Sequence, residues 1–316
     1  MAPKVSICIP TYNQLDYLKI CLQSIADQTF DDYEIIITDD SSDNQIELYV
    51  NTLTYKNKIN YNRNVIPLGS PKNWNYALQL AEGDLIKIIH HDDFFADPTA
   101  LKQFVEVFDT KPNVGFLFCS TKIKMVDSGE VKLHQIKSNQ LDTIYQEPEL
   151  LFYNNLIGAP SVVMMRKQNL AFFDENLKWL VDVDWYFKCI RKCMQIDVIR
   201  KPLVGTHHGF EGQTTQQVQN QKDIQVREHV IMFENIRANI KQLKQFNNCF
   251  EILFSKYAIN SLEELKAVVT YNKANESYYL ARIKNKNSFL FFKKMSFWIN
   301  KDGLKAIVDV IKSKFK

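Results

Sequence analysis

The stretch Leu85–Phe95 reads Leu-Ile-Lys-Ile-Ile-His-His-Asp-Asp-Phe-Phe, so an apolar run ends abruptly in two histidines and two aspartates. A short apolar run that follows Gly83 predicts a buried β-strand. In open α/β sheets, ligands bind beyond the carboxyl ends of the strands. Adjacent carboxylates at such an edge have the oxygen chemistry that divalent cations require. This stretch therefore predicts a sheet with a cation site at its carboxyl edge.

The chain before this stretch alternates between strands and helices. The predicted strands are 5–10, 33–38 and 59–61, and the predicted helices are an amphipathic segment with Leu18, Cys21, Leu22 and Ile25 on one face, a helix from about 44, and 73–81. Apolar strands separated by helices favour parallel pairing and a doubly wound sheet. The fold class expected is therefore α/β.

The chain after the stretch is less regular. We expect a helix at 100–108, strands at 114–119, 161–165 and 196–199, and a helix over 182–192. The polar span 132–142 predicts a surface excursion, and the glutamine-rich span 212–221 a mobile loop. From about 223 the pattern is helical to the end. These patterns predict an α/β unit over 1–222 and a helical region over 223–316.

Composition excludes several classes of protein. The chain has 316 residues and 37.0 kDa, with 46% hydrophobic and 24% charged residues, which is typical of a folded protein. Its net charge of +3 gives no sign of nucleic-acid binding. Its six cysteines (Cys8, Cys21, Cys119, Cys189, Cys193 and Cys249) lack metal-ligand spacing and suit reduced thiols in a cytoplasmic protein.

Membrane and secretion signals are not evident in the sequence. The opening Met-Ala-Pro-Lys is followed at once by a predicted strand, which leaves no room for a signal peptide. No apolar run approaches the roughly 18 residues of a spanning helix. We therefore expect a cytoplasmic protein that is soluble or peripheral to the membrane.

A second group of polar residues follows the first two predicted strands. Pro10-Thr11-Tyr12-Asn13 ends one strand and Asp39-Asp40 ends the other. If these strands are adjacent and parallel, the two groups share one edge. An aromatic face beside a carboxylate suits a nucleobase. The alternative is that Asp39–Asp43 caps the next helix, although the recurrence of polar strand ends favours a site.

These motifs together resemble the family 2 glycosyltransferases of the GT-A fold. The resemblance rests on Val5–Asn13, Tyr33–Asp43 and the Asp92-Asp93 turn, in that order and spacing, and covers about the first two thirds of the chain. It implies a Rossmann-like, mostly parallel sheet flanked by helices, with residues 1–222 as the GT-A catalytic domain. Within that domain, 1–98 would bind the nucleotide-sugar and 99–222 the acceptor. The region 223–316 would be a helical extension.

The resemblance also implies how the donor nucleotide is held. Tyr12 would stack on the base, Asp40 would bind the edge of uracil or another base, and Asp39 would support the loop. Pro10 and Thr11 belong to the same strand end. The segment Gly69–Leu78 is similar to a family pattern in which Asn73 and Asn75 shape the donor pocket. A capping role for Asn73 at a helix start is an equal alternative.

Asp92 and Asp93 match the family's metal-binding acidic motif. Two carboxylates this close repel unless a cation lies between them, and Mg²⁺ or Mn²⁺ bridging a diphosphate would supply it. We expect Asp93 to be the direct ligand and Asp92 to contact ribose or metal-bound water. His90 stands where the family usually has an acid, and imidazole suits transition metals better than Mg²⁺. For His90 and His91, a hydrogen bond to backbone is the competing interpretation.

Asp182-Val-Asp-Trp-Tyr-Phe187 resembles the family's acidic motif at a helix start, which supplies the catalytic base. Residues two apart do not share a face of a helix or a strand. The family pattern places the base directly before the aromatic residue, which selects Asp184 and leaves Asp182 to cap the helix. The alternative is a structural role for both aspartates.

Thr206–Thr215 resembles a late family segment whose histidine approaches the diphosphate or the metal. His208 is the candidate metal ligand and His207 the reserve, because only one can point inward from an extended strand. The glycine-bracketed loop that follows could close over the donor as a lid. A generic surface loop is the alternative.

From Arg282 onward lysines dominate and interleave with aromatic residues such as Phe289, Phe297 and Trp298. This pattern favours either contact with an anionic membrane surface or a helical bundle with solvated lysines.

The motifs and the resemblance together lead to one hypothesis. It is an inverting, metal-dependent transfer of sugar, with UDP-sugar as donor, to a glycan or lipid-linked acceptor in surface polysaccharide synthesis. The rival interpretations are a non-catalytic nucleotide- or glycan-binding module and a sugar nucleotidyltransferase. The latter would need an early glycine-rich basic loop, where this chain has Thr11–Gln14.

Overall fold

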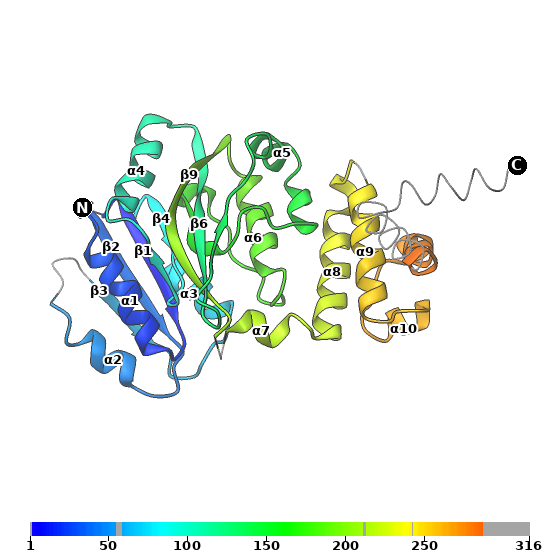
Figure 1. Cartoon of the computed structure of the whole chain (residues 1–316), viewed down its shortest axis with the longest axis horizontal. Coiled ribbons are helices and arrows are strands. Elements are labelled where there is room, and N and C mark those ends of the chain that lie inside the picture. Colours follow the sequence, from blue (N-terminus) through cyan, green and yellow to red (C-terminus); the bar gives the residue numbers. More distant parts are fainter. Residues whose placement is uncertain (1, 55–58, 211–212, 242, 287–316) are drawn as a thin grey trace, which may run out of the picture. The chain divides into compact units, whose positions relative to one another are not determined.

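The computed structural model describes residues 2–54, 59–210, 213–241 and 243–286. The chain divides between Asn220 and Gln221 into two compact units, drawn in Figure 1. The first unit is built around a sheet and the second from helices. Within the described residues no helix is both long and apolar enough to cross a bilayer.

The first unit contains one sheet of nine strands. The strands are β1 (Val5–Thr11), β2 (Tyr33–Asp39), β3 (Ile59–Arg63), β4 (Leu85–Ile88), β5 (Asp93–Phe95), β6 (Val114–Met125), β7 (Val131–His134), β8 (Val163–Arg166) and β9 (Gln195–His208). Their order across the sheet is β3-β2-β1-β4-β8-β6-β9-β5, and β7 pairs with β6.

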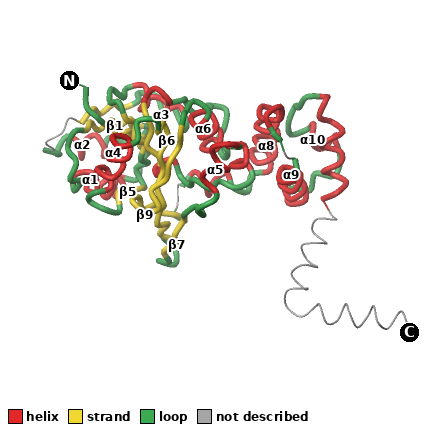
Figure 2. Tube along the Cα trace, turned by 90° about the horizontal axis from the view of Figure 1, so that it is seen from above, coloured by secondary structure: helices red, strands yellow, loops and turns green. Residues whose placement is uncertain are grey.

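The helices of the first unit cover both faces of this sheet. They are α1 (Leu15–Ala26), α2 (Gln45–Val50), α3 (Lys72–Gln79), α4 (Ala100–Thr110), α5 (Gln140–Gln146), α6 (Val181–Ile190) and α7 (Thr214–Val218). Helix α1 lies on one side of the sheet and α6 on the other (Figures 1 and 2). The core forms where the buried β-branched residues of the central strands meet the apolar helix faces, as in the fully buried β1 and the buried α1 stripe Leu18, Cys21, Leu22 and Ile25.

The parallel pairing expected from the sequence holds for the first four strands. Strands β3, β2, β1 and β4 are parallel neighbours. The second half of the sheet is mixed, because β8 runs antiparallel to both β4 and β6, while β6 and β9 are parallel to each other. The carboxyl ends of β1, β2 and β4 therefore meet at one edge, as the motifs required.

Two strands are much longer than their apolar runs predict. The second part of β6 alternates between exposed and half-buried residues, and it pairs with β9 through β-bulges. The ends of β6, β7 and β9 project beyond the rest of the sheet (Figure 2). The span expected as a surface excursion accordingly holds the exposed end of β7 and the start of α5.

The second unit consists of helices joined by short turns and loops in its described residues. It contains α8 (Lys222–Ile236), α9 (Lys244–Lys256), α10 (Leu262–Lys266) and a helical stretch at 276–286. Its core is a cluster of aromatic rings, with Phe233 stacked on Tyr278 at 4.8 Å and edge-on to Phe250 at 5.0 Å. The lysine-rich segment predicted to touch a membrane lies almost wholly outside the described residues.

Candidate functional site

The candidate site begins at the tight turn between β4 and β5. Strand β4 is fully buried and ends at Ile88, and β5 begins at Asp93. The turn closes where the Asp93 N–H donates to the carbonyl oxygen of His90 at 3.0 Å. Asp93 lies opposite Thr206 of β9. The sheet thus holds the backbone on both sides of the acidic residues.

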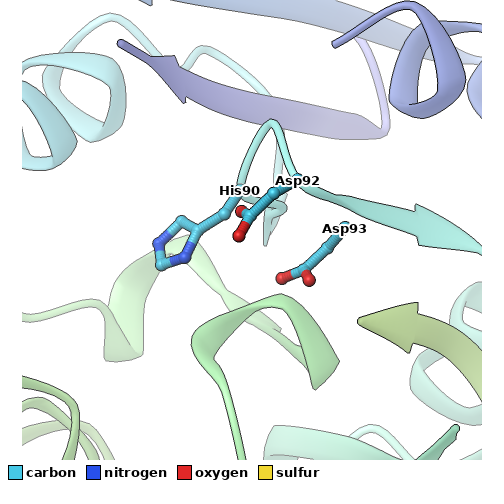
Figure 3. Close-up of side chains that lie close together, drawn as sticks. All are labelled: His90, Asp92 and Asp93. Carbon is cyan, nitrogen blue, oxygen red and sulfur yellow. The ribbon is translucent and has the colours of Figure 1, made fainter. Parts of the chain in front are cut away.

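Three side chains of this turn form a cluster of potential metal ligands. A ring nitrogen of His90 and one carboxylate oxygen each of Asp92 and Asp93 lie within 4.8 Å of one another. The three side chains point to the same side of the turn (Figure 3). Among the described residues, no other group of three acidic, histidine or cysteine side chains meets in this way.

Ser161 connects the members of this cluster. Its hydroxyl accepts a hydrogen bond from the His90 backbone N–H at 2.9 Å and donates one to the Asp93 carboxylate. Ser161 is fully buried in a short 3-10 helix, Pro160–Val162, just before β8. Ser161 therefore links the turn between β4 and β5 to the start of β8 through its hydrogen bonds.

Lys87 lies beneath the cluster, fully buried within β4. Its Nζ donates to the carbonyl oxygens of Ser161 and Ile88 and lies 5.4 Å from the centre of the Phe104 ring. Burial lowers the pKa of Lys87 to about 8. A cation at this place partly offsets the negative charge of Asp93, whose influence in turn raises the pKa of the lysine.

The charges of the cluster are poorly compensated within the protein. Burial, followed by repulsion from Asp92, raises the pKa of Asp93 well above its usual range, although Ser161 and Lys87 oppose the shift. Burial also lowers the pKa of His90 to about 4, so its ring is neutral near pH 7.

His90 Nε2 is buried without a hydrogen-bond partner, which costs about 1–3 kcal/mol. Two like charges beside an orphaned nitrogen fit a bound divalent cation, which would relieve both defects.

The acidic pair at the start of α6 is split between two environments. Burial raises the pKa of Asp182 to about 7, and the negative charge of Asp182 contributes to the raised pKa of Asp93. Asp182 Oδ1 is buried without a partner. Asp184 instead forms an ion pair with Lys188, one turn later, at 2.5 Å.

The capping role expected for Asp182 is wrong, whereas the base expected at Asp184 stays a prediction. Helix α6 has Leu180 at its N-cap and no side-chain cap, so Asp182 does not cap it. The charge of Asp182, and not that of Asp184, contributes to the raised pKa of Asp93.

The residues expected to bind the nucleobase lie at the ends of β1 and β2. Tyr12 has 55% of its surface exposed, so its ring can receive a planar ligand. Asp39 is fully buried and accepts hydrogen bonds from Thr11, Ser41 and Tyr61. The capping alternative for this segment is wrong for Asp39, whose hydrogen bonds join β1, β2 and β3.

The Asp40 carboxylate is also fully engaged in hydrogen bonds within the protein. It is only 2% exposed, and its oxygens accept hydrogen bonds from the Asn64 side chain and from the backbone N–H groups of Leu68 and Gly69. In this conformation its carboxylate holds the 64–69 loop and is not open to a base.

The two asparagines expected near the donor are both buried and hydrogen-bonded to backbone groups. Asn73 donates to the carbonyl oxygens of Thr11 and Thr38, and Pro71 holds the N-cap position of α3 instead. Asn75 exchanges two hydrogen bonds with the backbone of Phe173, at 3.0 and 2.8 Å. These contacts fix α3 to the sheet and to the segment before α6.

The two histidines at the end of β9 face different surroundings. His207 is buried, and its Nδ1 donates to the carbonyl oxygen of Asp92 at 2.7 Å. His208 is half-buried and does not belong to the ligand cluster among the described residues. His207, the reserve candidate, is thus the residue that steadies the acidic turn.

The segment after β9 is not wholly a loop, because α7 occupies Thr214–Val218. The Gln213 side chain donates to the carbonyl oxygen of His207 and accepts from the Gly209 N–H. Residues 211 and 212, at the centre of the expected lid, lie outside the described residues.

Sequence reasoning missed three residues of this site. Lys87 interrupts an otherwise apolar strand, and that single charge in Leu-Ile-Lys-Ile-Ile was a usable signal. Ser161 and Trp74 gave no local signal, because their roles depend on distant contacts. The Trp74 ring centre lies 4.5 Å from that of His90.

Comparisons with known proteins add independent findings. Residues 6–172, just over half of the chain, match the model of the family described as glycosyl transferase family 2. An uncharacterized protein of Mycobacterium tuberculosis is 28% identical over 247 residues, which span 72% of this chain and 75% of that one. An uncharacterized glycosyltransferase of Haemophilus influenzae is 25% identical over 60% of this chain and 62% of its own length.

Solved structures share the fold. TarS of S. aureus, in complex with UDP-GlcNAc, is similar with a TM-score of 0.56 and 20% identity, covering 96% of this chain and 77% of that chain. The mannosyltransferase PcManGT of Pyrobaculum calidifontis, in complex with GDP-Man and Mn²⁺, gives 0.52 and 14%, covering 99% and 80%. At these identities the likeness concerns the fold alone, and it confirms the GT-A architecture expected from the motifs.

Proposed function

Because the chain belongs to glycosyl transferase family 2 and is a glycosyltransferase, we propose that it moves a sugar from a nucleoside-diphosphate donor to an acceptor hydroxyl with inversion. The observation that carries this proposal is the cluster of His90, Asp92 and Asp93 at one sheet edge, where the charge of the buried Asp182 also contributes to the raised pKa of Asp93. One side of such a site can hold a diphosphate and the other can accept a proton.

The donor would lie along the ends of β1, β2 and β4. Tyr12, being exposed, would stack on the base, while Asp39 and Asp40 hold the loops beneath it. We propose that the nucleoside diphosphate of the donor is UDP. TarS was solved with UDP-GlcNAc and with UDP, and PcManGT with GDP-Man, so relatives of this fold take more than one base.

His90, Asp92 and Asp93 would hold a divalent cation, Mn²⁺ or Mg²⁺. When bound, such an ion offsets the negative charge that develops on a departing diphosphate. The protein's own part is to hold the three side chains in place, which Ser161 does directly and His207 does through the Asp92 carbonyl.

Asp182 would be the general base. In a single displacement the acceptor oxygen forms a bond to the anomeric carbon, the bond to the diphosphate breaks, and the hydroxyl proton moves to Asp182. A pKa of about 7 places this carboxylate near the optimum for a base at neutral pH. The ion pair with Lys188 makes Asp184 a weaker candidate than the sequence suggested.

The acceptor that we propose is a glycan or a lipid-linked glycan of a cell surface. The basic and aromatic C-terminal sequence supports peripheral binding to an anionic membrane, on the cytoplasmic side. Flotation with anionic liposomes tests this: the full chain should float and a chain cut after Tyr279 should not. Equal flotation of both would remove the idea.

The experiment that tests the function begins with a thermal-shift screen of nucleotide-sugars in the presence of Mg²⁺ or Mn²⁺. We expect one donor class to raise the melting temperature and to be hydrolysed slowly without acceptor. A chain that binds a donor but never releases its nucleoside diphosphate, with or without candidate acceptors, would be a binding module and not a transferase.

A further inference from the structure

We propose that His90 is itself a ligand of the metal ion and that it makes the site favour first-row transition ions over Mg²⁺. This inference builds on the cation site of the proposed function. It concerns which ion the site selects, and it can be tested without any sugar transfer.

The first support is the ring nitrogen. His90 Nε2 is buried and lacks a hydrogen-bond partner, although buried polar atoms in proteins nearly always have one. Histidines that serve only as structural groups are expected to bond to backbone, as two neighbours do: His91 Nδ1 donates to the Pro10 carbonyl oxygen and His207 Nδ1 to that of Asp92. His90 lacks such a bond on Nε2.

The second support is the arrangement around that ring. A ring nitrogen lies within 4.8 Å of a carboxylate oxygen of both Asp92 and Asp93. Small rotations of these side chains bring the three atoms to about 2.0–2.2 Å from one ion, the distance that such ligands take. All three side chains point to the same side (Figure 3). The ring is also kept in place, because Trp74 packs against it and Ser161 binds its backbone N–H.

The third support is ligand chemistry. Mg²⁺ binds oxygen almost exclusively and keeps most of its waters, whereas imidazole nitrogen suits transition ions, whose affinity rises from Mn²⁺ towards Co²⁺ and Zn²⁺. One nitrogen and two carboxylate oxygens on one side of the ion leave the remaining positions for water or for the oxygens of a diphosphate. The donor set therefore favours a transition ion.

The test measures the bound ion directly. Full-length protein is loaded with Mn²⁺ alone, without nucleotide, and examined by electron spin-echo envelope modulation, which detects a coordinated imidazole nitrogen. We expect nitrogen modulation in the wild type, its loss in His90→Gln, and its retention in His91→Gln, the matched control on the next residue. Circular dichroism checks that each variant is folded.

A competition experiment completes the test. In His90→Asp, which restores an all-oxygen site, the affinity for Co²⁺ relative to Mg²⁺ should fall by about tenfold or more. Nitrogen modulation that survives in His90→Gln, or an unchanged affinity ratio, would overturn the assignment. The assignment would also be overturned if the protein bound no ion, either by itself or in the presence of UDP. Normal spectra with no sugar transfer would instead count against the proposed function.

Discussion

At the scale of single residues, the site is a set of buried charges that the protein compensates only in part. Lys87 and Ser161 stabilise the Asp93 carboxylate from below, while Asp92 and Asp182 repel it. Leaving a buried group uncompensated costs stability. We infer that the fold accepts this cost because a charged ligand completes the site, and two predictions follow from the two aspartates of α6.

The first concerns which aspartate is the base. Asp182→Asn should lower kcat by about 10²–10⁴-fold, the usual contribution of general base catalysis, and should leave donor binding nearly unchanged. Asp184→Asn, the matched control two residues away, should keep most of its turnover because its carboxylate already pairs with Lys188. Steady-state kinetics and donor titration give both values. The opposite pattern would restore Asp184 as the base.

The second concerns stability in the metal-free protein. Burial raises the pKa of Asp182 in the folded state to about 7 from its ordinary value of 3.8, so between these pH values the folded state binds more protons than the unfolded state. Stability attributable to Asp182 should therefore fall as pH rises from about 4 to 7, by an amount on the order of a few kcal/mol.

Asp182→Asn removes this titration. Urea unfolding with EDTA present should show the variant gaining stability over the wild type as pH rises through that window. A difference between the two proteins that stays constant from pH 4 to pH 8 would contradict the burial of this carboxylate.

At the scale of elements, the acidic turn depends on the pairing of β5 with β9. Gly205 lies opposite Phe94, beside the pair that Asp93 forms with Thr206. A Cβ atom at Gly205 would overlap the Phe94 ring. This glycine therefore permits the close approach that fixes the first residue of β5.

Gly205→Ala should destabilise the fold by about 1–3 kcal/mol, the usual cost of overpacking. A second change, Phe94→Leu, should recover much of that loss in the double variant, because it removes the ring that the new methyl group meets. Urea unfolding of the two single variants and the double variant gives the coupling. Additive effects would show that the ring is not the cause.

The sequence predicted those strands and helices that the local residue pattern alone determines. The strands β1, β2 and β4 were found because each is a short buried run with polar residues at its end. The antiparallel direction of β8 and the full length of β9 were not found, since pairing with distant strands decides them. The choice between Asp182 and Asp184 stays a prediction for a similar reason: the packing of α6 sets its rotation, and the spacing of two acids does not.

At the scale of the whole molecule, the site and the family match belong to one unit. Residues 6–172 carry the match, and Tyr12, the acidic cluster and Asp182 all lie before the division at Asn220. The second unit has an aromatic core of its own, centred on Phe233 and Phe250. Each unit thus has the buried apolar surface that independent folding requires.

A chain cut after Asn220 should therefore fold and bind Mn²⁺ and UDP with affinities within about threefold of the full chain, since every residue assigned to the site lies in the first unit. A matched cut after Lys201 removes the half of β9 that pairs with β5, and with it the strand opposite Asp93. We expect that shorter chain neither to unfold cooperatively nor to bind the ion. Calorimetric unfolding and isothermal titration of the three chains compare them directly. If the cut after Asn220 abolished binding as completely as the cut after Lys201, the helical unit would have to be counted as part of the catalytic fold.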